Sequence, residues 1–167
     1  VANLPEKLVE KDTPALDALV VQPDLPQARI WTEEDYLHAM DVLQKLTENA
    51  LKSTEKQPDV VVWPECAVPA PLNYPDYRFR RNSVLQQFNS LFLIGATHLR
   101  YTSRDVKEPN VFNCAFLIDP HAAYMKTIFD PADHVIDYYD KIHRVPFGEF
   151  TPFGKYLPRL VVLTRLG

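Results

Sequence analysis

The apolar run Val-Val-Val-Trp at residues 60–63 is followed immediately by Pro64 and Glu65. A short stretch without polar alternation is typical of a strand buried on both faces, as in sheets covered by helices. Such a strand requires a layered fold around it. It also places the carboxylate of Glu65 at the carboxyl end of a strand, where α/β folds build their functional sites.

Strand and helix patterns alternate around this run. The apolar segment 18–22 predicts a first strand, and Thr32 followed by acidic residues predicts the N-cap of an amphipathic helix over about 33–55. The prolines of residues 68–76 predict that this segment has no regular structure. Beyond it we expect a helix at 77–89, strands at 91–96, 111–118 and 124–129, and a long functional loop with one tight turn at 130–150.

The order of the expected elements defines the fold class. Early strand–helix alternation followed by paired strands predicts a mixed sheet in an α/β layered fold. Residues 1–16 are interpreted as a linker or an extended arm, and residues 17–167 as the domain. Apolar residues make up 46% of the 167-residue chain, which is enough for one domain with a hydrophobic core.

Composition excludes several classes of function. The net charge is −4 and no basic stretch could follow a phosphate backbone, so we expect no nucleic-acid partner. No apolar run reaches the roughly 18–20 residues of a membrane span. The glycines form no phosphate-binding pattern, and Cys66 and Cys114 have neither the number nor the spacing for a disulfide framework or a metal site. The sequence therefore gives no support for a metal site built on these cysteines or for a nucleotide-phosphate site.

Glu65 and Lys141 are the candidate acid–base residues. Desolvation at the end of a buried strand would make Glu65 a general base, and a lysine beside it could stabilise a developing oxyanion. Glu149 follows a Pro-Phe-Gly turn and could position Lys141. From position alone, each of the three could instead be an ordinary surface charge, and for a lone lysine that is the commoner role. We expect structural roles for His134 and His143.

The two cysteines are the candidate nucleophiles within the chain. Neighbouring residues on an extended chain point to opposite faces, so Cys66 is poorly placed to use Glu65 as its base. Cys114 lies inside an expected strand and is expected to pack as a small hydrophobic residue. We therefore predict that the chain lacks the nucleophile of this acid–base pair.

Two motifs together resemble the nitrilase (carbon–nitrogen hydrolase) superfamily and, within it, the apolipoprotein N-acyltransferases. One is Trp-Pro-Glu at 63–65. The other is Tyr-Asp-Lys-Ile-His at 139–143, continued by Val-Pro-Phe-Gly-Glu-Phe-Thr-Pro-Phe at 145–153. The opening strand with the loop up to Trp31, and the Asn-Cys-Ala-Phe segment at 113–116, are also similar to that family.

The resemblance, which spans residues 17–155, implies a role for each candidate. It makes Glu65 the general base, Lys141 the oxyanion-stabilising lysine and Glu149 a second essential glutamate. Trp31 matches a tryptophan near the lipid site of the family. The family's nucleophilic cysteine follows a later strand in an Ile-Cys-Tyr-Glu-like setting, and this chain contains no such motif.

The resemblance also implies a fold and a reaction. The fold is the α-β-β-α sandwich of the superfamily, incomplete here because the chain matches the N-terminal half of the catalytic domain. The reaction is acyl transfer without metal or cofactor: a cysteine takes an acyl chain from a phospholipid as a thioester and passes it to the N-terminal cysteine amine of a lipoprotein. The parent enzyme is expected in the inner membrane, held by flanking segments, with its catalytic domain in the periplasm. This chain alone is expected to be inactive.

Two alternatives stay open. His143 and Arg144 replace the family's usual His-Leu pair, and residues 119–138 are longer and more acidic than its usual turn. A soluble, cytoplasmic amidase of the same superfamily would need the same Glu65 and Lys141. A non-catalytic half-domain that only binds a partner would account for the missing nucleophile.

Overall fold

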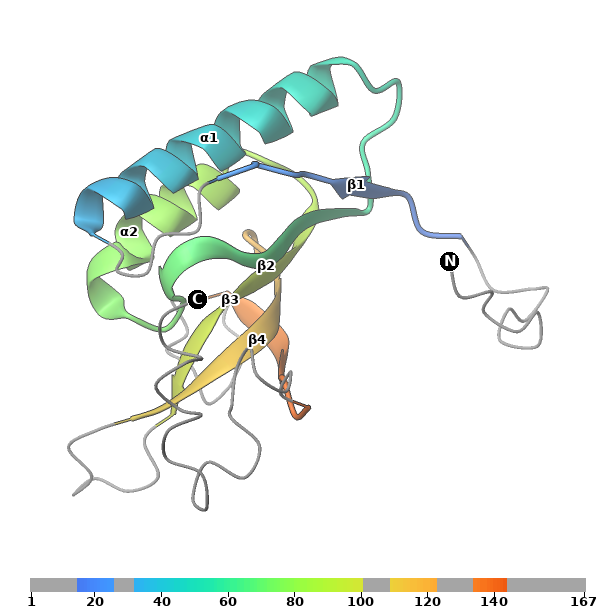
Figure 1. The fold of residues 1–167 in the computed structure, drawn as a ribbon. Helices are drawn as coiled ribbons and strands as arrows, with labels where there is room; N and C mark the ends of the chain where they lie inside the picture. Colours follow the sequence, from blue (N-terminus) through green and yellow to red (C-terminus); the bar gives the residue numbers. More distant parts are fainter. Residues whose placement is uncertain (1–14, 26–31, 101–108, 123–133, 144–167) are drawn as a thin grey trace.

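The computed structural model describes residues 15–25, 32–100, 109–122 and 134–143. Within these ranges a five-stranded sheet carries two helices on one face (Figure 1). The elements follow the chain in the order β1 (Ala18–Val20), α1 (Glu33–Lys52), β2 (Val60–Pro71), α2 (Pro75–Leu85), β3 (Leu91–Arg100), β4 (Asn110–Ile118) and β5 (Val135–Asp140).

The sheet is mixed, as the order of the elements predicts. Strands β1, β2 and β3 are parallel, whereas β4 and β5 are each antiparallel to the preceding strand. The spatial order is the chain order, β1-β2-β3-β4-β5. The two parallel connections contain α1 and α2, as crossovers between parallel strands require. The carboxyl ends of β1, β2 and β3 therefore share one edge of the sheet.

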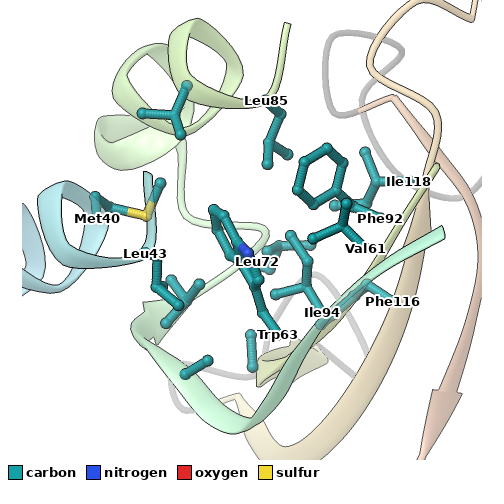
Figure 2. Close-up of a cluster of buried hydrophobic side chains, with 14 of the residues drawn as sticks. Met40, Leu43, Val61, Trp63, Leu72, Leu85, Phe92, Ile94, Phe116 and Ile118 are labelled. Atoms are coloured by element: carbon teal, nitrogen blue, oxygen red, sulfur yellow. The ribbon is translucent and has the colours of Figure 1, made fainter. Parts of the chain in front are cut away.

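The hydrophobic core lies between the sheet and the two helices. Figure 2 shows Met40 and Leu43 of α1 and Leu85 of α2 pointing toward apolar side chains of the sheet. The indole N–H of Trp63, buried in this core, donates to the hydroxyl of Thr47 at 3.2 Å, so its polar group is satisfied. The sheet contributes the fully buried side chains Val61, Trp63, Phe92, Ile94, Phe116 and Ile118.

Thr32 caps α1, as predicted. The backbone N–H of Asp35 donates to the Thr32 hydroxyl at 3.2 Å, and the Thr32 N–H donates to the Asp35 carboxylate at 2.8 Å, which forms a capping box. The helix ends at Lys52, slightly earlier than predicted. The backbone N–H and the hydroxyl of Ser53 both bond the carbonyl of Ala50 and close the last turn there.

The prediction that residues 68–76 have no regular structure is wrong. Strand β2 extends to Pro71, with register shifts against β3 on both sides of Val68. Prolines are tolerated at such irregularities because the ladder does not need their missing N–H. Pro75 opens α2, which was predicted at 77–89. The first turn of a helix leaves its N–H groups without intrahelical partners, so proline fits there.

Strand β5 occupies part of the segment 130–150, which was predicted to be a long loop. It pairs with β4 from Cys114 opposite Asp140 to Ile118 opposite Val135. The β-branched and aromatic residues of β5 fit a pleated surface, although its aspartates obscured the pattern. The predicted strand at 124–129 lies outside the described residues, as does the predicted arm before residue 15.

One row of apolar residues lies on the sheet face away from α1 and α2. The strand register places Val20, Val62, Leu93 and Leu117 side by side across four strands. Val20 is 66% exposed and Leu93 37%, whereas the residues that flank Leu93 along β3 are buried in the core. Among the described residues, no helix covers this face (Figure 1).

Candidate active site

Glu65 and Lys141 meet on the uncovered face of the sheet. The Nζ atom of Lys141 donates to Oε1 of Glu65 at 3.1 Å. The Glu65 side chain is 62% exposed and that of Lys141 31%. The expectation of a desolvated Glu65 is therefore wrong for the described part of the chain. The reason is that the carboxylate projects over a face on which none of the described helices packs.

Gly95 of β3 sets the path of the chain at Glu65. A Cβ atom at residue 95 would lie 2.4 Å from the carbonyl oxygen of Pro64 and 2.6 Å from the Cα of Glu65. Such contacts are far inside van der Waals distance and involve backbone atoms. Only glycine lets β2 approach β3 this closely at the point where the two strands lose their regular register.

Asn113 of β4 links the two halves of the pair. Its carboxamide nitrogen donates to Oε1 of Glu65 at 3.1 Å, and its backbone carbonyl accepts the N–H of Lys141 at 2.7 Å. The sequence reasoning did not include Asn113 among the site residues. The signal was present in the Asn-Cys-Ala-Phe segment at 113–116, which was noted only as part of the resemblance.

Cys66 lies closer to this cluster than side-chain alternation predicts. Its φ angle is 56°, a left-handed conformation that interrupts the extended chain directly after Glu65. The exposed Sγ atom lies 3.8 Å from Oδ1 of Asn113, the same side chain that holds Glu65. The argument that Cys66 and Glu65 must point to opposite faces therefore fails, because the backbone is not extended at Cys66.

Cys114 packs as a small hydrophobic residue, as predicted. Its side chain is 6% exposed and belongs to the core. Burial, reinforced by a hydrogen bond to the Asp140 carboxylate, raises the pKa of this thiol to about 12. The thiol is therefore protonated at neutral pH and is a poor nucleophile.

Asp140 and His98 form a buried pair on the helix side of the sheet. The Nδ1–H of His98 donates to Oδ1 of Asp140 at 2.8 Å, and Arg100 forms an ion pair with Oδ2. Among the described residues, His98, Cys114 and Asp140 are the group whose ligand atoms could hold a metal ion, all within 4.8 Å of one another. Both Asp140 oxygens already accept hydrogen bonds, Oδ1 from His98 and Oδ2 from Arg100.

A cavity of about 300 Å³ opens beside the Glu65–Lys141 pair. Most of its wall is apolar, and Glu65, Asn113 and Lys141 are among the residues that line it. It therefore combines room for an apolar substituent with an acid–base pair at one side. The lining residues are Val62, Trp63, Pro64, Glu65, Leu93, Gly95, Asn113, Cys114, Ala115, Tyr139 and Lys141.

The other predicted residues do not join this cluster within the described ranges. Trp31 and Glu149 lie outside the described residues. His143 is exposed just beyond Lys141. His134 has a left-handed backbone, with φ 55°, and Nδ1 of its ring lies 3.3 Å from the carbonyl oxygen of Ala122, consistent with a structural role.

Comparison with known proteins agrees with the resemblance. No protein-family model matches the chain. The chain is 31% identical over 150 residues to the apolipoprotein N-acyltransferase of Brucella suis biovar 1 (strain 1330), which covers 90% of this chain and 26% of that protein. The corresponding enzyme of Photobacterium profundum is 30% identical over 166 residues, or 99% of this chain and 29% of the relative. The chain is homologous to a fragment of the apolipoprotein N-acyltransferases. It spans between a quarter and a third of the length of these relatives.

The fold is also found in a solved structure. The crystal structure of an N-terminal amidase matches with a TM-score of 0.50 at 18% identity, covering 75% of this chain and 28% of the amidase chain. The predicted α/β class is confirmed, and the chain shares its sheet with part of the amidase fold. None of the described helices is both long and apolar enough to cross a bilayer.

Proposed function

We propose that this chain is the N-terminal part of the catalytic domain of an apolipoprotein N-acyltransferase. The observation that carries the proposal is the 3.1 Å contact between Lys141 and Glu65 in a chain homologous to those enzymes. In the proposed reaction an acyl chain passes from a phospholipid to the N-terminal cysteine amine of a lipoprotein. The nucleophilic cysteine belongs to a part of the protein beyond this chain.

Glu65 and Lys141 have different roles in the first step, the formation of the acyl-enzyme thioester. The Glu65 carboxylate accepts the proton of the nucleophilic thiol as sulfur attacks the ester carbonyl of the phospholipid. The Lys141 ammonium stabilises the oxyanion of the tetrahedral intermediate. The intermediate expels the lysophospholipid alcohol, which takes the proton back from Glu65, and leaves a thioester. The lipoprotein amine then attacks the thioester and releases the thiol.

The hydrogen bonds to Glu65 support this division of roles. Oε1 accepts from both Lys141 and Asn113. Both of these bonds go to the same oxygen, so Oε2 is the oxygen assigned to receive the thiol proton. Positioning a base in this way lowers the entropic cost of proton transfer.

The uncovered sheet face supports the proposal that the domain continues beyond this chain. The apolar row of Val20, Val62, Leu93 and Leu117 would pack against the second sheet of an α-β-β-α sandwich. That sheet would also close the cavity beside Glu65. Trp31, as a lipid-site residue, and Glu149, as a second essential glutamate, remain proposals within the same scheme, as does a periplasmic domain on the inner membrane.

The full-length protein tests the proposal directly. Purified in detergent, it should transfer a labelled acyl chain from phospholipid to a peptide with an N-terminal diacylglyceryl-cysteine. A hydroxylamine-sensitive acyl adduct should accumulate on the enzyme when the peptide is omitted. Hydrolysis of small amides with no use of phospholipid would instead support the amidase alternative.

A further inference from the structure

The largely buried carboxylate of Asp140 connects β5 to β3 across β4. Asp140 ends β5 and pairs with Cys114 of β4, while its partners His98 and Arg100 lie on β3. The Asp140 side chain is 11% exposed and that of His98 4%. A carboxylate buried to this degree is stable when charged partners or hydrogen-bond donors satisfy it, as His98 and Arg100 do here.

His98 is itself held rigidly on the helix side of the sheet. Its ring makes edge contacts with Phe116 at 5.7 Å and with Tyr138 at 5.1 Å between ring centroids. These contacts orient the ring so that Nδ1–H points at Asp140. The donor that holds Asp140 is therefore fixed before any substrate binds.

Lys141 follows Asp140 directly, and the two side chains leave the chain on opposite faces of the sheet. Asp140 joins His98 on the helix side, whereas Lys141 joins Asn113 and Glu65 on the side of the cavity. The backbone N–H of Lys141 donates to the Asn113 carbonyl at 2.7 Å, one bond beyond the end of β5. Because consecutive side chains of an extended segment alternate, fixing Asp140 on one face directs Lys141 to the other.

We propose that His98 and Arg100 are positioning residues that hold Lys141 at Glu65 by anchoring Asp140. The inference rests on the proposed function for its effect on catalysis, although the anchoring itself does not depend on the reaction. Within the described part of the sheet β5 is an edge strand, so its end needs such a side-chain anchor to hold one geometry. A displacement of about 1 Å in a positioned catalytic group can lower a rate by about 100-fold.

Two substitutions at His98 separate anchoring from packing. H98N keeps an N–H donor close to the position of Nδ1 but loses the aromatic ring. H98F keeps the ring between Phe116 and Tyr138 but loses the donor. In the full-length protein, H98F should lower kcat for acyl-enzyme formation by about tenfold, and its KM should stay within about twofold of the wild-type value. The kcat of H98N should stay within about threefold of the wild-type value. Equal rates for H98F and wild type, or a larger loss in H98N than in H98F, would overturn the proposal.

Arg100 provides a second test. Its side chain is 45% exposed, so a substitution at this position should be tolerated by the fold. R100M should lower kcat several-fold, and R100K should restore most of it. The matched control is D41N, which breaks the Arg80–Asp41 ion pair on the helix surface. It should leave the kinetics unchanged. A kcat for R100M equal to that of D41N would count against the proposal.

A chemical readout keeps the result independent of the acyl-transfer reaction. The Lys141 amine, held on Glu65, should react slowly with an amine acylating reagent relative to the exposed Lys56, as quantified by peptide mass spectrometry. H98F and R100M should raise the relative labelling of Lys141 several-fold. If the wild-type protein fails to transfer acyl chains while this labelling change occurs, the proposed function is wrong, and the proposal that His98 and Arg100 position Lys141 is retained. Unchanged labelling in both variants overturns the positioning.

Discussion

The Nζ atom of Lys141 lies 3.1 Å from Oε1 of Glu65, although 76 positions separate the two residues in the chain. Three strands of the sheet contribute to this proximity. Glu65 belongs to β2, Lys141 follows β5, and Asn113 of β4 bonds both of them. The contact is therefore a product of sheet register and not of local sequence.

Substituting either member of this pair should remove activity without unfolding the protein. We expect E65Q and K141M in the full-length enzyme to slow acyl-enzyme formation by about 100-fold or more, because the base or the oxyanion donor is lost. The change in unfolding free energy should stay within about 1 kcal/mol, as for other solvent-exposed ion pairs. Thioester accumulation and thermal denaturation check the two parts.

The control for these variants is K56M, which removes the exposed Lys56–Asp17 ion pair. It should leave the thioester rate unchanged. Near-normal thioester formation in E65Q or K141M would remove that residue from the mechanism.

Removing the Asn113 carboxamide should impair the positioning of Glu65. N113A loses the donor to Oε1, and N113D places a second carboxylate beside it. We expect about a tenfold lower rate for N113A, and a lower rate still for N113D because like charges repel across a short distance. Acylation assays on the full-length protein measure both.

C66A is the matched comparison, because Cys66 contacts the same asparagine. The thioester should still form in C66A. Loss of the acyl adduct in this variant would make Cys66 the nucleophile and would contradict the proposal that it lies beyond this chain.

Adding one methyl group at Gly95 should displace the strand that carries Glu65. The new Cβ atom would meet Pro64 and Glu65 backbone atoms at 2.4 and 2.6 Å, and backbone cannot move aside cheaply. G95A should cost about 1–3 kcal/mol of stability and lower activity beyond the loss of folded protein. D41N, which removes the Arg80–Asp41 ion pair on the helix surface, is the control and should keep wild-type activity. Full activity in G95A would show that the close approach is dispensable.

The raised pKa of Cys114 should make the protein less stable at alkaline pH. In the unfolded chain the thiol ionises near 9.0, whereas in the folded protein it keeps its proton up to about 12. Between these values the folded state binds more protons, so the unfolding free energy should fall as pH rises. Chemical denaturation of wild type and C114A from pH 8 to 10 should show a steeper decline for wild type. Parallel curves would contradict the assignment.

Local sequence patterns predict much of the fold, but they fail where contacts with residues far apart in the chain determine the local structure. The apolar run at 60–63 and the Thr32 cap marked β2 and α1 because burial and capping leave direct signals in the sequence. The prolines before α2 led to a wrong prediction, since register shifts and a helix start accommodate them. Strand β5 was missed because its aspartates interrupt the apolar pattern. The partners of Asp140, His98 and Arg100, lie on β3, where a linear pattern cannot identify them.

The sequence by itself determined the residue types of the candidate site and the alternation of strands and helices. Its motifs at 63–65 and 139–153 also identified the similarity to the apolipoprotein N-acyltransferases. Only the tertiary structure decided that Glu65 and Lys141 touch, that Asn113 joins them, and that His98 and Arg100 hold Asp140 on the opposite face. The physical reason is that strand order and register set these distances, and both depend on the packing of residues far apart in the chain.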